Sequence, residues 1–200
     1  MHVYVAVEGL LDEAVVKRLL ADVGVDDLYV FGRKGKSHLL RQLKNYNQAA
    51  HYDPWLVLLD LNGDSDCAPN ALSKWLPDPA PRICLRIAVR EIESWLLADH
   101  ERMAKKLGIS RARLPRAPDD EADPKRTVVR LATGSRRREI RQGVARGGKG
   151  DHRIGPLYNA MLSEFVRDRT KGWRPEVAAE RSPSLARSLA AIRRFADSFG

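Results

Sequence analysis

Carboxylate side chains follow three separate apolar runs of the sequence, and their chemistry suits a divalent cation. Glu8 follows the first run, Asp60 follows the third, and Glu91 and Glu93 follow the fourth. Acidic groups gathered at one place repel one another unless a positive charge compensates them. Mg²⁺, or Mn²⁺ in its place, prefers oxygen ligands and supplies that charge. We therefore predict a divalent-metal site built from these acids.

The polar turn after the third run adds further oxygen donors. The run WLVLL passes into Asp60 and then into Asn62 and Asp64. An aspartate after a strand is also typical of a turn or a helix N-cap, and this alternative stays open for each of these acids, above all for Asp64 and Asp66. On a helix Glu91 and Glu93 would diverge by roughly 200°, so we favour Glu91 as the ligand. The predicted metal ligands are Glu8, Asp60, Asn62, Asp64 and Glu91.

The elements that must position these acids alternate between strands and helices. Apolar runs predict strands over residues 3–7, 28–31, 55–59 and 83–89, and the spacing of apolar residues predicts helices over 11–20, 37–46 and 68–76. This order is typical of an α/β fold with a parallel sheet of about four strands flanked by helices. The carboxyl ends of parallel strands share one edge, where open α/β sheets bind ligands. The strand order therefore predicts that the acids meet.

The second half of the chain has a different pattern. Residues 91–108 predict one helix with no further strand after it. Residues 125–150 are basic and glycine-rich, and within them residues 136–150 predict a flexible, phosphate-facing loop. Helices are predicted over 154–167 and 184–199, the last opened by Ser182 and Pro183. We expect an α/β domain over residues 1–100 and a basic, mainly helical extension over 101–200, packed on it as one structural unit.

Charge is distributed unevenly along the chain. Residues 1–100 carry 11 Lys and Arg against 14 Asp and Glu, whereas residues 101–200 carry 24 against 12. A basic half favours a nucleic-acid partner, DNA or RNA, although a basic surface that serves solubility is the open alternative. The predicted phosphate contacts are Lys34, Lys36, Arg90, Arg136, Arg137, Arg138, Arg146, Lys149 and Arg153.

The turn GRKGKS between the second strand and its helix resembles part of a nucleotide-binding loop. A Walker A motif requires glycine at position 30, where this chain has Val30, so we exclude a nucleoside triphosphatase of that type. The turn could still offer backbone N–H groups to a phosphate, with Lys34 and Lys36 nearby. An ordinary solvated basic turn is the alternative.

Several other classes of protein are disfavoured. Cys67 and Cys84 are too few for a disulfide framework and lack metal-type spacing. No apolar run approaches the length that spans a bilayer, and the first residues lack a basic leader and a cleavage site. We expect a cytoplasmic protein without a membrane partner.

Four segments together resemble the TOPRIM domains of topoisomerases, primases and some nucleases. VEGLLDE and LLDLNGD match the two-part TOPRIM signature, and DCAPNALSKWL and IAVREIESWLLAD are similar to a bacterial TOPRIM-related family of unknown function. The resemblance covers roughly the first hundred residues. It implies a TOPRIM or Rossmann-like sheet and Mg²⁺-dependent phosphoryl transfer on nucleic acid, with nuclease activity as the leading expectation.

The resemblance also implies roles for single residues. Glu8 would be the catalytic glutamate, acting as a general acid or base or as a metal ligand, and Asp60 would be the first aspartate of a paired motif. Asn62 stands where the second aspartate is expected, and an amide brings no charge. Asp12 matches an acidic position of the nuclease branch, although it could equally serve the helix dipole. The alternative that Asn62 favours is a non-catalytic module of a bacterial defence or repair system that binds nucleic acid or a protein.

Overall fold

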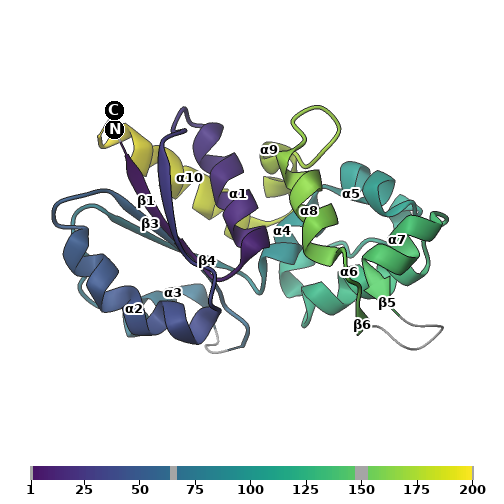
Figure 1. The fold of residues 1–200 in the computed structure, drawn as a ribbon, viewed down its shortest axis with the longest axis horizontal. Coiled ribbons are helices and arrows are strands. Elements are labelled where there is room, and N and C mark those ends of the chain that lie inside the picture. Colours follow the sequence, from purple (N-terminus) through teal and green to yellow (C-terminus); the bar gives the residue numbers. More distant parts are fainter. Residues whose placement is uncertain (1, 64–66, 147–152, 200) are drawn as a thin grey trace. The chain divides into compact units, whose positions relative to one another are not determined.

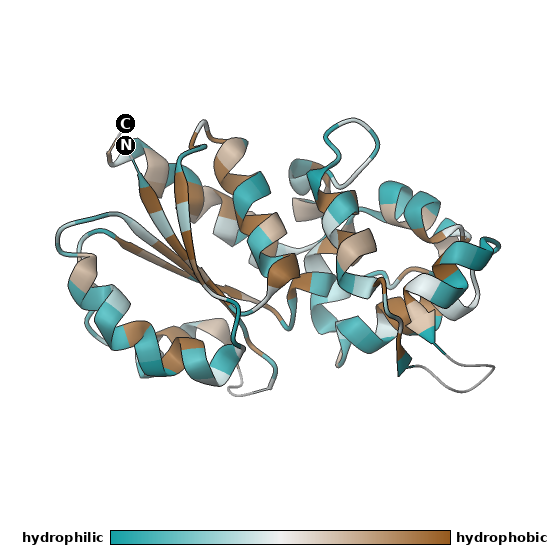
Figure 2. Cartoon of the chain, viewed as in Figure 1, coloured by the Kyte–Doolittle hydropathy of each residue, from teal (hydrophilic) through white to brown (hydrophobic). Residues whose placement is uncertain are grey.

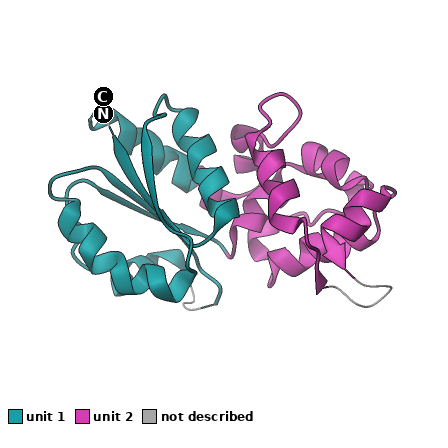
Figure 3. Cartoon of the chain, viewed as in Figure 1, with its two compact units in different colours: residues 1–89, 187–200 teal, residues 90–186 magenta. Residues whose placement is uncertain are grey.

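The protein forms two compact units (Figure 3). The computed structural model describes residues 2–63, 67–146 and 153–199. Unit 1 comprises residues 1–89 and 187–200, and unit 2 comprises residues 90–186. Unit 1 is therefore built from two separate stretches of the chain. The expected division into residues 1–100 and 101–200, packed as one structural unit, stays a prediction.

A four-stranded parallel sheet is the centre of unit 1 (Figure 1). Its strands are β1 (Val3–Val7), β2 (Leu28–Gly32), β3 (Trp55–Asp60) and β4 (Ile83–Ala88), in the order β2-β1-β3-β4. Every neighbouring pair is parallel. The predicted α/β class with about four parallel strands is confirmed.

Helices cover both faces of this sheet. They are α1 (Leu10–Ala21), α2 (Lys36–Ala49), α3 (Ala68–Trp75) and α10 (Pro183–Asp197). Figure 1 shows α1 and α10 on one face and α2 and α3 on the other. All six residues of β3 are buried, which is typical of a central parallel strand and agrees with the apolar strands in Figure 2. Leu39 and Leu43 of α2 pack in one buried cluster with Val57 and Leu59 of β3.

Unit 2 is built mainly from short helices. They are α4 (Ile92–Ala98), α5 (His100–Leu107), α6 (Pro124–Thr133), α7 (Arg138–Gly143), α8 (Tyr158–Arg167) and α9 (Pro175–Ala179), with two 3₁₀ turns at Arg111–Arg113 and Pro118–Asp120. Its core includes Trp95 and Trp173, which are both fully buried. The indole N–H of Trp95 donates to Ser184 Oγ, and that of Trp173 donates to the Trp95 carbonyl. These bonds satisfy both buried indoles.

The single helix predicted over residues 91–108 is wrong, because Asp99 divides it into α4 and α5. The fully buried Asp99 carboxylate accepts a hydrogen bond from the Arg102 backbone N–H and caps α5. It also accepts bonds from the backbone and the guanidinium of Arg174. Such a distant partner cannot be read from the local apolar spacing.

The flexible loop predicted over residues 136–150 is also wrong over residues 136–146, the part that the structure describes, because these residues include a helix and a short strand. Asp123 caps α6 by accepting from the Arg126 N–H, Pro124 takes the first helical position, and α7 follows. Two short strands, β5 (Ala145–Arg146) and β6 (Arg153–Ile154), form an antiparallel pair, although no further strand was expected. The helix predicted from residue 154 begins instead at Tyr158, because Ile154 belongs to β6.

The last helix begins where the sequence predicts. The Ser182 hydroxyl accepts a hydrogen bond from the Leu185 N–H at 3.2 Å, and Pro183 is the first residue of α10. Ser182 itself donates to Asp119. Among the described residues, no helix is both long enough and apolar enough to cross a membrane.

Candidate active site

Two acids that are far apart in the sequence meet at the carboxyl edge of the sheet. Glu8 follows β1 and Asp60 ends β3, and β1 and β3 are neighbours. The backbone N–H of Asp60 donates to Oε1 of Glu8 at 2.8 Å. Asp60 is only 6% exposed. The backbone of one acidic residue thus orients the carboxylate of the other.

This meeting point has a special place in the topology. The chain leaves β1 for β2 on one side of the sheet, whereas β3 lies on the other side of β1. The carboxyl ends of β1 and β3 therefore mark the topological switch point of the sheet, where open α/β sheets bind their ligands. Glu8 and Asp60 lie at this point of the sheet.

The turn after β2 packs against the end of β1. Gly32 has a φ of 90°, and a Cβ atom there would lie 2.3 Å from the Val7 carbonyl oxygen. The N–H groups of Arg33 and Gly35 donate to the carbonyls of Val7 and Glu8. Gly32 therefore permits the close approach that brings the basic turn to the acidic edge.

Lys36 brings a positive charge to the same edge. Its ammonium group donates to the backbone carbonyl oxygens of Asp60 and Leu61, the second at 3.0 Å. It also lies 4.8 Å from the centre of the Trp75 ring. The sequence predicts Lys36 as a phosphate contact, and the structure places it beside the end of β3. The helix was predicted from Ser37, and α2 begins one residue earlier, at Lys36.

Asp12 and Asn62 flank the two acids along the chain. Asp12 is in the first turn of α1, is 7% exposed, and its Oδ2 would lie 3.2 Å from a Cβ on Gly9. Asn62 is exposed with a φ of 47°, a left-handed conformation that asparagine tolerates. Asp64, also predicted as a ligand, lies outside the described residues.

Glu91 and Glu93 belong to unit 2, and each has a partner there. Glu91 Oε2 accepts from the Lys125 N–H at 2.9 Å, in the first turn of α6. Glu93 Oε1 accepts from the Tyr158 hydroxyl at 2.9 Å and lies 3.7 Å from the Lys125 ammonium. Burial raises the pKa of Glu93 to about 7 and the pKa of Tyr158 well above its usual value. The assignment of Glu91, or of Glu93, to the metal stays a prediction.

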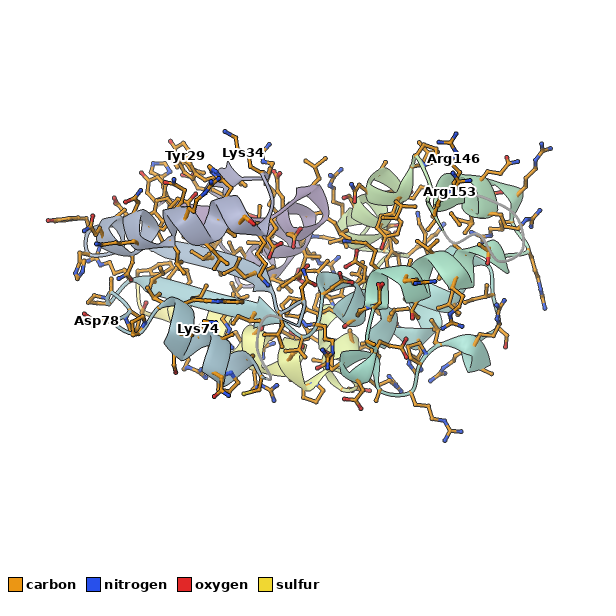
Figure 4. All side chains as sticks on the ribbon, turned by 90° about the horizontal axis from the view of Figure 1, so that it is seen from below. Tyr29, Lys34, Lys74, Asp78, Arg146 and Arg153 are labelled. Atoms are coloured by element: carbon orange, nitrogen blue, oxygen red, sulfur yellow. The ribbon has the colours of Figure 1, made fainter. Side chains whose placement is uncertain are left out.

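The predicted phosphate contacts lie on both units. Lys34 is exposed on unit 1, and Arg136, Arg137 and Arg138 are exposed on unit 2, where Arg90 is half-buried. Arg146 and Arg153 are exposed and lie opposite each other in the β5–β6 pair (Figure 4). Lys149 lies outside the described residues.

The donors at the switch point fit a magnesium ion by their chemistry. Among residues 2–63, 67–146 and 153–199, no three His, Cys, Asp or Glu side chains form a group that could hold a metal. Magnesium, however, usually takes one or two carboxylates and completes its shell with water and substrate phosphate. Glu8 and Asp60 provide two carboxylates at one edge, and this donor set is sufficient for that mode of binding.

Comparisons with known proteins add no relative. No family model, curated protein or solved structure matches this chain. The assignment of a function therefore depends on the residues and their geometry.

Proposed function

We propose that this protein is a Mg²⁺-dependent phosphodiester hydrolase of TOPRIM type that acts on nucleic acid. The observation that carries the proposal is the hydrogen bond from the Asp60 N–H to Glu8 at the topological switch point of the sheet. This bond holds two acids from distant segments where an α/β sheet binds ligands. The sequence resemblance assigns catalytic roles to the same two residues.

Each residue of the edge has a part in the proposed reaction. Bound Mg²⁺, held by Glu8 and Asp60, would supply the charge that polarises the scissile phosphate and lowers the pKa of a water molecule. The Asp60 N–H fixes the direction of the Glu8 carboxylate that would hold the ion. The Lys36 ammonium, fixed by two backbone carbonyls, attracts the phosphate to this edge.

Arginines of unit 2 would hold the nucleic-acid backbone without reading its sequence. Arg136, Arg137 and Arg138 are exposed in a row, and Arg146 faces Arg153 across the β5–β6 pair. Arginine guanidinium groups can bind phosphate oxygens in a bidentate manner. Contacts of this kind suit DNA and RNA equally.

A cleavage assay tests the proposal. Purified protein with Mg²⁺ or Mn²⁺ should degrade or nick DNA or RNA, and a chelator should stop the reaction. Glu8→Gln and Asp60→Asn should each reduce the rate at least ~100-fold, because either change removes a metal-binding charge. Glu8→Gln retains the oxygen that accepts from the Asp60 N–H, so we expect this variant to fold.

Asp53→Asn is the matched control for these substitutions. Asp53 is exposed and precedes β3, whereas Asp60 ends the same strand. The control variant should cleave at the wild-type rate. Equal inactivity of metal-loaded and chelator-treated wild-type protein on every nucleic acid would refute the proposed hydrolase.

A non-catalytic nucleic-acid-binding module is the second candidate. Two observations favour it: the Lys36 ammonium already places a positive charge beside the Asp60 backbone, and Asn62 replaces an expected carboxylate. In that case binding should persist in chelator, survive Glu8→Gln, and weaken steeply as salt rises. Metal-dependent cleavage that Glu8→Gln abolishes would exclude this candidate.

A further inference from the structure

Edge strand β2 carries two exposed aromatic side chains on one face. Tyr29 and Phe31 are 48% and 43% exposed and, two residues apart, point to the same side of the sheet. Each ring packs against another aromatic ring of the sheet. Tyr29 stacks on Tyr4 with ring centres 5.4 Å apart, and Phe31 lies 5.4 Å from Trp55. The exposed rings are therefore held in place while one side of each stays accessible.

A basic groove lies beside these rings. Its volume is about 710 Å³, and no acidic side chain among the described residues lines it. Arg33 in the groove pairs with Glu13 at 3.0 Å, whereas Lys34 has no ion pair or side-chain hydrogen bond with any residue that the structure describes. The lining residues are Val30, Phe31, Gly32, Arg33, Lys34, His38, Gln42 and Tyr46.

We propose that this groove binds single-stranded nucleic acid, with bases stacked on Tyr29 and Phe31 and the backbone phosphates on Lys34 and His38. Aromatic platforms next to cationic groups are the usual means of binding single strands without reading sequence. The bases of a duplex stack on one another and do not offer their faces to such rings. The inference rests on the proposed function and specifies its substrate class.

The chain connects this groove directly to the candidate active site. Strand β2 runs from Tyr29 toward Gly32, and the turn that follows donates hydrogen bonds to Val7 and Glu8 at the end of β1. Lys36, the first residue of α2, reaches the carbonyls of Asp60 and Leu61. A strand lying along Tyr29, Phe31 and Lys34 would thus be led to the carboxylate edge of unit 1.

Charge argues against a second copy of the chain as the occupant of the groove. A symmetric pair formed through this face would gather the Lys34 ammonium groups of both copies in one interface. Like charges gathered in one interface are unfavourable, whereas a polyanion would be attracted. Nucleic acid therefore fits the groove better than self-association does.

Binding can be measured separately from cleavage. The probe is a fluorescently labelled single-stranded oligothymidylate, and fluorescence anisotropy in chelator, on the Glu8→Gln background, prevents hydrolysis. Tyr29→Ala and Phe31→Ala should each raise Kd about tenfold or more, since each removes one stacking platform. Tyr29→Phe keeps the ring and should bind like the parent protein, which separates loss of stacking from misfolding.

Two matched controls belong to the same experiment. Tyr52 is 79% exposed outside the groove, so Tyr52→Ala should leave Kd unchanged. Lys34→Gln should weaken binding several-fold, whereas Lys74→Gln should not. Figure 4 shows Lys34 beside Tyr29 on one side of unit 1 and Lys74 on the other side of this view.

The outcomes separate this inference from the proposed hydrolase. Tighter binding of the single strand than of its duplex, lost in Tyr29→Ala and Phe31→Ala, supports the groove even if no cleavage is found. Equal affinity for both substrates, or equal Kd for Tyr29→Ala and Tyr52→Ala, overturns the groove even if the wild-type protein cleaves with Mg²⁺. Self-association that the same aromatic substitutions abolish, without nucleic-acid binding, also overturns it.

Discussion

At the scale of single residues, two buried carboxyl groups have very different surroundings. Asp60 lies at the edge of the sheet, where its own N–H binds Glu8 and Lys36 reaches its carbonyl. Glu93 is 1% exposed inside unit 2, and its partners are Tyr158 and Lys125. The sequence shows both as acids that follow strands. Only the structure distinguishes an acid at the sheet edge from one enclosed by helices.

The buried Glu93 makes unit 2 sensitive to pH. Burial raises the pKa of Glu93 from 4.5 to about 7. The positive charge of Lys125 acts to lower this pKa, and the negative charge of Glu91 acts to raise it further. In the unfolded chain the carboxyl ionises first as pH rises, so the free energy of unfolding should fall between pH 4.5 and 7, on the order of 3 kcal/mol. Glu93→Gln cannot ionise and should lack this decrease. Urea unfolding of both proteins across that pH range measures the difference.

Glu139→Gln provides the control for this measurement. Glu139 is exposed on α7 of the same unit, so the loss of its ionisable carboxyl group should leave the pH dependence of unfolding unchanged. Parallel pH profiles for wild-type protein and Glu93→Gln would contradict the assigned burial of the Glu93 charge.

At the scale of elements, the strands were predictable because their apolar runs are short, continuous and bounded by polar turns. Strand β3 is buried along its whole length, and its short apolar run WLVLLD, bounded by polar turn residues, is typical of a buried strand. The helices of unit 2 were less predictable. The buried Asp99 interrupts an otherwise continuous helical pattern because Arg174, 75 residues later, binds it. Local spacing carries no information about such a partner.

Asp99 should therefore contribute strongly to stability. Its carboxylate is fully buried, caps α5, and binds Arg174, whose pKa the hydrogen bonds with Asp99 raise. Asp99→Asn retains one acceptor oxygen but removes the charge, and we expect the free energy of unfolding to fall by about 2 to 4 kcal/mol. Equilibrium unfolding in urea measures this decrease in the free energy of unfolding.

Asp120→Asn is the appropriate comparison for Asp99→Asn. Asp120 is exposed in the same unit, and its substitution should change the free energy of unfolding by less than about 0.5 kcal/mol. If the two variants proved equally stable, the Asp99–Arg174 interaction would not be what fixes the junction of α4 and α5.

At the scale of the whole molecule, unit 1 takes in residues from both ends of the chain. Residues 187–200 return to the sheet unit after almost a hundred residues of unit 2. The sequence predicts the last helix and its Ser182 cap, but not the unit to which the helix belongs, because an apolar stripe does not specify its partner. The excess of basic residues after residue 100 was visible in composition, whereas their places on helices and on the β5–β6 pair were not.

Only part of the candidate site was predictable from the sequence. The alternation of strands and helices predicts that Glu8 and Asp60 share one edge, because parallel strands end together. The Lys36 contact with the end of β3 and the aromatic face of β2 depend on how helices and edge strands pack, and they emerged only from the three-dimensional arrangement. The ligand assignment of Asp64 lies outside the described residues and stays a prediction.

Anomalous X-ray scattering from crystals soaked in Mn²⁺ tests the central claim most directly. The claim is that Glu8 and Asp60, brought together by the sheet, bind a divalent cation. We expect one or more Mn²⁺ peaks within coordination distance of both carboxylates, at about 2.0 to 2.3 Å, and no peak there in Asp60→Asn crystals. Saturating Mn²⁺ that leaves both carboxylates without a peak, or that binds Asp60→Asn equally well at this edge, would contradict the account.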